Sequence, residues 1–149
     1  MEDYINNLQN NDESPFKLNI YYDIGENSAI NDAISEALKI NTHLQQLNII
    51  GNNIGDKGAI AISEALKVNT GLQILYISGN KIGYKGAIAI SEALKVNTGL
   101  QILNIYSNNI GENGAIAIGR VCFTFSLIKR NNLEALKVNT GLQKLLVLM

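Results

Sequence analysis

The chain has 149 residues, of which 46% are hydrophobic and 17% charged, and its formal net charge is −1. This length suits one compact domain with a sizeable core, and the near-neutral charge creates no field that would attract nucleic acid. One cysteine and one histidine exclude a disulfide framework and a zinc site built from clustered cysteine and histidine.

No segment reaches the roughly 18 consecutive apolar residues that a membrane helix needs, and the N-terminus lacks the pattern of a secretory signal. None of the 21 asparagines lies in an Asn-x-Ser/Thr frame, which favours a location inside the cell. We therefore expect a cytoplasmic protein that has no membrane and no nucleic-acid partner.

The first residues differ from the rest of the chain. Residues 1–15 are polar apart from Tyr4, Ile5 and Leu8. We interpret them as a leader that either forms one turn of helix over the end of the core or is disordered. Residues 16–149 form a repeat array whose first unit is irregular, because the step from Leu18 to its counterpart Leu47 exceeds the later steps by one position. Terminal repeats are commonly atypical because they close the open end of the core.

One pattern, Leu-Gln-x-Leu-x-Ile, occurs three times with a constant period, beginning at Leu44, Leu72 and Leu100. Each copy is followed by Asn-x-Ile-Gly and then by Gly-Ala-Ile-Ala-Ile. A 28-residue period lies in the range of about 20 to 29 residues of leucine-rich repeats and below the roughly 33 to 34 of ankyrin and tetratricopeptide units. We therefore predict an array of about four units.

Each unit is predicted to contain one short strand, one turn and one helix. Leu47-Asn48-Ile49 alternates apolar and polar residues, as a half-buried strand does. Asn52 is expected to hydrogen-bond backbone groups of the turn, Gly55 to adopt a positive φ, and Asp56 to cap the helix that follows. Apolar residues then return every three or four positions, which predicts one buried helical stripe. The small Gly58 is expected to let this helix lie close to the sheet.

The outer surface of the helices has two expected features. Glu64 and Lys67 lie three positions apart and are expected to form an ion pair worth about 0.2–0.5 kcal/mol. Isoleucines occupy an outward position where a polar residue is expected, at Ile60, Ile88 and Ile116. They either form a second contact line or reflect a compositional bias, and we favour the bias.

Parallel strands in one layer and wider helices in the other predict an α/β horseshoe segment, with strands on the concave face and helices on the convex face. The full pattern, L-x-x-L-x-I-x-x-N-x-I-G-x-x-G-A-x-A-I-x-E-A-L-K-x-N, resembles the ribonuclease-inhibitor-like class of leucine-rich repeats, which also occurs in NOD-like receptors and Ran GTPase-activating proteins. Residues 44–99 contain two complete units, and 100–118 match to the middle of a helix. The resemblance implies a solenoid and says little about function, because this class binds many unrelated partners.

The fourth unit departs from the pattern. Residues 119–132 are inserted in its helix, so that the step from Leu100 to its counterpart Leu142 exceeds one period by the length of the insertion. The insertion is either a functional loop or elongated helix, or a gene-level artefact, which we favour. The sequence then reaches an apolar strand within residues 145–149 with no helix behind it. An uncapped strand predicts self-association through this end, or a fragment of a longer array.

Nothing in the sequence indicates catalysis, a cofactor or a metal. His43 takes the place of glycine at a helix-to-strand turn, and we expect it to face solvent rather than act as a general base. Cys122 lies in the insertion with no histidine or basic partner defined by spacing. The Gly-x-x-Gly spacings at the helix starts lack the lysine and hydroxyl of a phosphate-binding loop. We therefore predict a protein that is not an enzyme.

The predicted binding surface consists of outward-facing residues in and just after the strands: Tyr21, Asn48, Ile50, Tyr76, Ser78, Asn104 and Tyr106. Tyrosines among asparagine and serine are typical of protein-contact surfaces, because tyrosine buries a large area at a low entropic cost. The leading hypothesis is a non-enzymatic module that presents its concave sheet to an unidentified partner protein. Two alternatives stay open: a regulator of a small GTPase, implied by the resemblance to Ran-activating proteins, and an inactive fragment of a NOD-like-receptor-type array.

Overall fold

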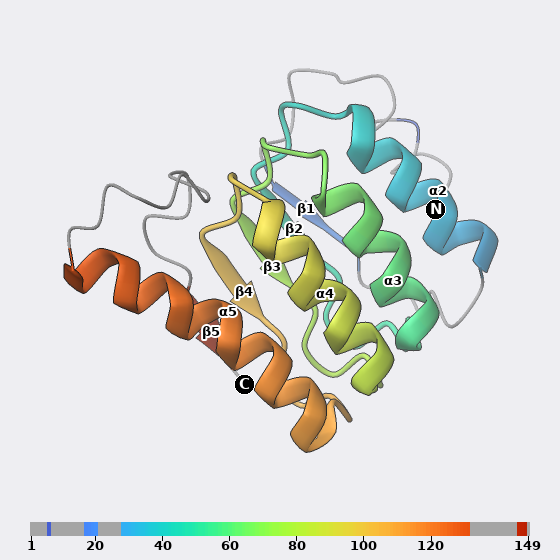
Figure 1. Ribbon diagram of the computed structural model, residues 1–149. Coiled ribbons are helices and arrows are strands. Elements are labelled where there is room, and N and C mark those ends of the chain that lie inside the picture. Colours follow the sequence, from blue (N-terminus) through green and yellow to red (C-terminus); the bar gives the residue numbers. More distant parts are fainter. Residues whose placement is uncertain (1–5, 7–16, 21–27, 132–145, 149) are drawn as a thin grey trace.

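The computed structural model describes residues 6, 17–20, 28–131 and 146–148. Three-residue strands alternate with helices along the chain, in the order β1 (Lys17–Asn19), α2 (Ser28–Ile40), β2 (Gln46–Asn48), α3 (Gly55–Leu66), β3 (Ile74–Tyr76), α4 (Tyr84–Val96), β4 (Ile102–Asn104), α5 (Gly111–Asn131) and β5 (Leu146–Leu148). Figure 1 shows the helices side by side in one layer and the strands in a second layer behind them. The predicted solenoid of strands and helices is confirmed. Apart from Asn6, the expected leader of residues 1–15 lies outside the described residues.

The five strands form one parallel sheet in chain order. Leu47 pairs with Leu75, and Leu75 pairs with Leu103, so the sequence period places equivalent leucines on neighbouring strands. Leu18 pairs with Leu47, the counterpart that the sequence pattern assigns to it. The spacing of the repeats therefore fixes the register of the first four strands.

The fifth strand does not follow the sequence pattern. With the insertion included, the repeat would pair Leu103 with Leu145, whereas Leu103 pairs with Val147 in the structure. The strand is thus two residues further along the chain than the repeat pattern indicates. A shift of two residues keeps the same alternate positions on each face of the sheet, so the apolar pattern tolerates it. Residues 119–131 of the predicted insertion continue α5 as helix.

The core lies between the two layers and consists of the same positions of each unit. The middle residue of each of the strands β1 to β4 is buried, and so is one stripe of each helix from α2 to α4. In the second unit these buried residues are Leu44, Leu47, Ile49, Ile54, Ala59, Ile62, Ala65 and Leu66. The predicted buried stripe is confirmed.

The glycine at the start of each helix has a neighbour that the sequence did not indicate. A Cβ on Gly86 would lie 2.8 Å from the Cβ of Ala59 on the preceding helix, and one on Gly114 would lie 2.8 Å from the Cβ of Ala87. Each such Cβ would also meet the isoleucine between the strand and the helix of its own unit, and on Gly58 that contact is the nearest, 2.5 Å from the Cβ of Ile54. These glycines therefore let the helix pack closely against the preceding helix as well as against the core residue that follows its own strand.

Asparagine side chains join the turns that follow the strands. The Asn80 side chain donates to the carbonyl oxygen of Ile49 at 2.8 Å, and its Oδ1 accepts the backbone N–H of Asn52 at 2.9 Å. Asn108 makes the equivalent bonds to Ile77 and to Asn80. The expected turn role of these asparagines is confirmed, and each one also bonds to the preceding unit.

A second row of asparagines joins the ends of the helices. The Asn69 side chain donates to the carbonyl oxygens of Leu38 and Asn41 at 2.6 and 2.7 Å, and its Oδ1 accepts the N–H of Leu72 at 2.8 Å. Asn97 repeats this arrangement one unit later. The last carbonyl groups of a helix have no hydrogen-bond partner within that helix. The asparagine that follows the next helix supplies this partner for the C-terminal ends of α2 and α3.

Asp56 does not cap its own helix, which corrects the prediction from the sequence. The N-cap of α3 is Ile54, and no side chain bonds there. Instead, the Asp56 Oδ1 accepts the backbone N–H groups of Gly83 and Gly86, each at 2.8 Å. The carboxylate therefore caps α4, the helix of the next unit. Gly55 has φ 59°, as predicted.

The ion pair expected on the outer surface of the helices is present. Lys67 and Glu64 form an ion pair at 2.6 Å, and the same pair recurs on α2 and α4. All three pairs are largely exposed, so each contributes little to stability. Ile60, Ile88 and Ile116 are exposed by 40%, 40% and 44%.

Candidate protein-binding face

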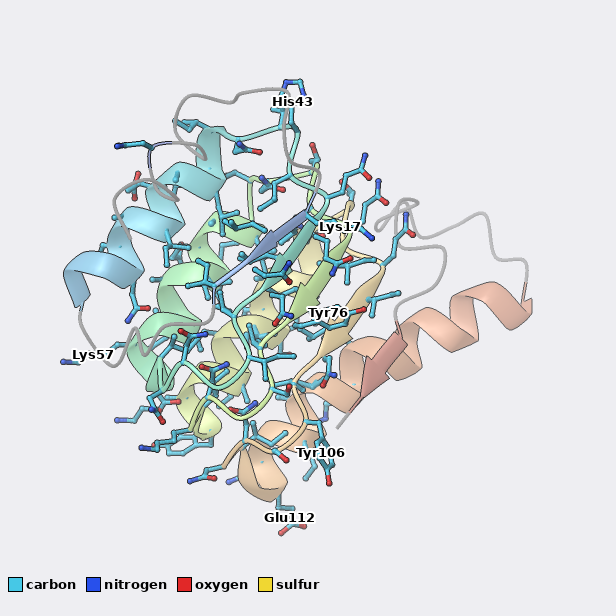
Figure 2. The ribbon with its side chains drawn as sticks, turned by 180° about the vertical axis from the view of Figure 1, so that it is seen from behind. Lys17, His43, Lys57, Tyr76, Tyr106 and Glu112 are labelled. Atoms are coloured by element: carbon cyan, nitrogen blue, oxygen red, sulfur yellow. The ribbon has the colours of Figure 1, made fainter. Side chains whose placement is uncertain are left out.

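The side of the sheet that faces away from the helices is covered by no described element; we call it the open sheet face. Figure 2 looks onto this face, with Lys17, Tyr76 and Tyr106 labelled along it. In β1 to β4 the first and third residues of each strand are at least partly exposed while the middle residue is buried. The outward residues of these four strands are Lys17, Asn19, Gln46, Asn48, Ile74, Tyr76, Ile102 and Asn104.

The register brings the predicted site residues together in two adjacent rows. Asn48 pairs with Tyr76, which pairs with Asn104. Just beyond the strands lies a second row, Ile50, Ser78 and Tyr106. It is held by backbone bonds from Gly51 to Ser78 and from Gly79 to Tyr106, both 3.0 Å. Tyr21, the remaining predicted residue, lies outside the described residues.

Two large side chains are exposed at the end of the face near the turns. Tyr106 is exposed by 60% and Ile50 by 43%. The chain turns directly after them through left-handed backbone at Gly51 (φ 70°), Gly79 (φ 65°) and Ser107 (φ 53°). Glycine adopts this conformation readily, and serine does so only under constraint. The turn at Ser107 therefore fixes the position of the Tyr106 backbone from which its side chain extends.

Two predicted contact residues also have a local structural role that the sequence did not reveal. The Oδ1 of Asn48 accepts the N–H of Ile50, and the Oδ1 of Asn104 accepts the N–H of Tyr106, both at 3.1 Å. An asparagine that bonds the backbone two residues ahead is a common turn device. These asparagines hold the exposed Ile50 and Tyr106 in place.

The first residue of each strand also faces outward but is not among the predicted site residues. Gln46, Ile74 and Ile102 are partly exposed on the same face as the predicted site residues, and Lys17 is exposed there. Ile74 and Ile102 look like core residues because they are apolar. The alternation of a strand could have identified them, since each lies two positions before a predicted site residue.

The charge on this face is small. Lys17 is the single charged residue in the five described strands. A surface with so little charge gives weak long-range steering and relies on contact area.

The helical layer has a hollow of about 360 Å³ between α2 and α3. Its lining mixes acidic, basic and apolar side chains: Asp32, Ser35, Glu36, Lys39, Lys57, Ile60, Ala61 and Glu64. Two of these charges, Glu36 and Lys39, already pair with each other. None of the predicted site residues lines this hollow.

Other candidate chemistry is sparse in the described part of the chain. No group of three or more histidine, cysteine or acidic side chains there could hold a metal ion. Among the described helices, none is both long enough and apolar enough to cross a membrane. His43 is exposed at the turn before β2, as expected, and the side chain of Cys122 lies outside the described part.

The repeating unit agrees with a known sequence family. Residues 41–63, 68–91 and 96–119 each match the family described as Leucine Rich repeat. The chain contains leucine-rich repeats. Each match runs from the end of one helix through a strand and a turn into the next helix, which is the unit that the structure stacks. No curated protein matches the chain.

Two solved structures share the leucine-rich-repeat fold of this chain. The structure titled "Leiomodin-1 Actin-Binding Site 2 (ABS2)" has a TM-score of 0.75 and 24% identity, over 99% of this chain and 79% of that chain. The tropomodulin C-terminal domain of Caenorhabditis elegans has a TM-score of 0.71 and 14% identity, over 99% of this chain and 82% of that chain. At these identities the likeness concerns the fold alone.

Proposed function

We propose that this chain is a non-enzymatic protein-binding module whose open sheet face contacts the partner. The observation that carries the proposal is the placement of Tyr76 and Tyr106 on one face of neighbouring strands of a parallel sheet, with Tyr106 exposed by 60%. Ile50 lies in the same row as Tyr106, with Ser78 between them. Large side chains that remain exposed on an ordered surface gain free energy when a partner removes them from water.

The scaffold behind this face is suited to recognition. Backbone and asparagine bonds join each turn to the next unit, so the exposed side chains sit on ordered backbone. A preorganised surface loses less conformational entropy on binding than a mobile loop does. Leucine-rich-repeat solenoids present such extended concave surfaces.

Actin is the first partner to test, because the leiomodin-1 structure of the same fold is titled an actin-binding site. The alternative predictions, a regulator of a small GTPase and part of a NOD-like-receptor-type array, rest on the resemblance in sequence pattern. Stimulated GTP hydrolysis by a small GTPase, measured with the purified chain, tests the first of them. A cytoplasmic location belongs to the same proposal.

The test compares the wild-type chain with two double variants. Tyr76→Ala with Tyr106→Ala removes two aromatic rings from the open sheet face. Tyr84→Ala with Val96→Ala removes two side chains of α4 that are exposed by 51% and 56% on the helical layer. Binding to purified actin is measured by co-sedimentation with filaments and by gel filtration with monomers. Affinity capture from cell extract, with the same three proteins, extends the comparison to other partners.

The sheet-face variant alone is expected to bind the partner at least tenfold more weakly, because a tyrosine that acts as an interface hot spot contributes about 2 kcal/mol or more. Circular dichroism must show that both variants are folded. If the sheet-face variant binds every partner as tightly as the wild-type chain does, the proposed surface is wrong.

A further inference from the structure

Three isoleucines form a row across the outer surface of the helical layer, on the side of the molecule opposite the open sheet face. Ile60 lies on α3, Ile88 on α4 and Ile116 on α5, and each is exposed by 40% or more. The helix α4 packs against both α3 and α5 in one layer, as Figure 1 shows. The constant period of the repeat therefore places the isoleucines at equivalent points of neighbouring helices.

Charges of opposite sign lie on the two sides of this isoleucine row. On α3, the exposed Lys57 lies three positions before Ile60, and the exposed Glu64 lies four positions after it. Each spacing is about one turn of helix, so all three side chains share the outer surface. The helix α4 repeats this arrangement with Lys85, Ile88 and Glu92.

The charges on this surface can form further ion pairs. Each glutamate of the pattern pairs through one carboxylate oxygen with a lysine of its own helix, Glu64 with Lys67 and Glu92 with Lys95. A carboxylate has a second oxygen and can accept from a second cation. Among the residues that the structure describes, no ion pair involves Lys57 or the equivalent lysine of α4.

A second copy of this chain matches the surface in both charge and spacing. When a twofold axis runs along the isoleucine row, the facing helices are antiparallel and isoleucine meets isoleucine. The axis exchanges the two sides of the row, so Lys57 of each copy faces Glu64 of the other. On α4, Lys85 faces Glu92 in the same way. The distance between neighbouring helices is the same in both copies, so all of these contacts form together.

The opposite orientation of the second copy is unfavourable. With parallel helices, a twofold axis through Ile88 would place Lys85 against the same lysine of the other copy and Glu92 against the same glutamate. Like charges in contact repel each other. The pattern of charges therefore favours antiparallel helices.

The complementary surface ends at α2 on one side and at α5 on the other. Asp32 takes the position of the isoleucine on α2, and Arg120 takes the position of the glutamate on α5. Two Asp32 side chains would face each other across the axis, which is unfavourable. Packed helices lie about 8–10 Å apart, so the isoleucine row is roughly 20 Å long. Such a patch is smaller than the interface of about 1,200 Å² or more that stable complexes bury, so we expect a weak dimer.

We propose that two copies of this chain associate through their helical layers, with the isoleucine rows in contact and each lysine of the pattern opposite a glutamate of the other copy. From the sequence alone, a compositional bias is the favoured explanation of these isoleucines, whereas the opposite charges on their two sides favour a contact. In this dimer the two open sheet faces point away from each other. The dimer can therefore bind two sites of one partner assembly, which raises the overall affinity.

Charge reversal tests the proposal, with dimerisation measured by sedimentation velocity over a range of concentrations. The acidic variant carries Lys57→Glu with Lys85→Glu, and the basic variant carries Glu64→Lys with Glu92→Lys. Like charges face each other in a homodimer of either variant. An exposed ion pair changes an affinity by about twofold to fivefold, and several pairs are reversed together, so each variant is expected to dimerise at least tenfold more weakly than the wild-type chain.

A mixture of equal amounts of the two variants is the decisive sample. In a heterodimer, every acidic side chain of the pattern faces a basic one, so the mixture is expected to dimerise at least as well as the wild-type chain does. High salt should weaken this heterodimer, because exposed charges are screened. Circular dichroism must show that both variants are folded.

Substitutions of apolar and acidic residues test the position of the contact. Ile88→Ser is expected to weaken the dimer, because it removes apolar surface from the centre of the row. Val68→Ser is the matched control, since Val68 is exposed by 61% beyond the end of α3 and outside the row. Asp32→Ile extends the row and removes the contact between like charges, so it is expected to strengthen the dimer.

Three results would overturn this inference. The first is a wild-type chain that stays monomeric up to its highest soluble concentration. The second is a mixture that dimerises no better than the separate variants do. The third is a dimer of equal strength in the wild-type chain and both charge variants, which would place the contact on another surface. The open sheet face is unchanged in all of these variants, so the proposed function stands or falls by its own test.

Discussion

The carboxylate of Asp56, in the first turn of α3, accepts the backbone N–H of Gly83 at 2.8 Å, at the start of α4. It accepts the N–H of Gly86 at the same distance. The first turn of α4 contains no acidic residue of its own. The preceding unit thus supplies both the hydrogen-bond acceptor and the negative charge that a helix N-terminus favours.

Replacing Asp56 by alanine is expected to lower the free energy of unfolding by about 0.5–2 kcal/mol, the usual range for loss of an N-cap. Asp56→Asn retains an acceptor oxygen without the charge and should lose less. Urea unfolding followed by circular dichroism measures both. Glu112→Ala is the control, because Glu112 is an exposed acid in the first turn of α5. An equal loss in Asp56→Ala and Glu112→Ala would contradict the cross-unit cap.

Removing one of the asparagines that join the turns after the strands should lower the free energy of unfolding more than removing Asp56 does. Asn80 is completely buried, accepts the N–H of Asn52 and donates to the carbonyl oxygen of Ile49. Asn80→Ala leaves these buried backbone groups without partners, and we expect a loss of about 2–4 kcal/mol in the free energy of unfolding. Asn113→Ala, at an exposed position, should change it by less than about 0.5 kcal/mol. A change of less than about 0.5 kcal/mol for Asn80→Ala would show that the asparagines between the turns do not stabilise the repeat array.

Two glycines are expected to respond to alanine in opposite directions. A Cβ on Gly99 would overlap the backbone carbonyl of Thr70 in the preceding unit, so Gly99→Ala must displace backbone. Gly119 lies inside α5 with no atom near the added Cβ. We expect Gly99→Ala to lower the thermal midpoint of unfolding. Gly119→Ala should raise it by the equivalent of about 0.5–1 kcal/mol, the usual difference between the two residues in a helix. Differential scanning calorimetry measures both midpoints, and a stable Gly99→Ala would contradict the close approach of the units.

Deleting residues 119–132 restores the spacing of the complete units. In that variant Leu145 follows Leu103 by one period, so we expect Leu145 to become the partner of Leu103 in place of Val147. Backbone nuclear Overhauser effects between the two strands distinguish the registers. A variant that keeps the pairing of Leu103 with Val147 would show that the apolar pattern of the last strand, and not the repeat spacing, sets the register.

The parts of the fold that each unit repeats could be predicted from the sequence. The register of Leu47, Leu75 and Leu103, the buried helical stripe and the turn role of Asn52 all follow from the period. The cap formed by Asp56 could not be predicted. It joins a side chain of one unit to the backbone of the next, and the third unit has Tyr84 at that position. The row of Asn69 and Asn97 was missed for the same reason, since its bonds cross between units.

The candidate site was predicted in part. Ile50 and Tyr106 are exposed as the alternation of the strands indicated. The outward positions of Ile74 and Ile102 were not recognised, because an apolar residue beside a buried leucine has the same appearance in the sequence as a core residue. The alternation of the strand separates the two cases, since neighbouring strand residues point to opposite faces and each isoleucine lies next to a buried leucine.

Whether the open sheet face binds the partner is decided by the affinity of that partner for the two double variants. We expect Tyr76→Ala with Tyr106→Ala to weaken binding at least tenfold, and Tyr84→Ala with Val96→Ala to bind within about twofold of the wild-type chain. Equal affinity for the wild-type chain and the sheet-face variant, or a loss confined to the α4 variant, would contradict binding by the open sheet face.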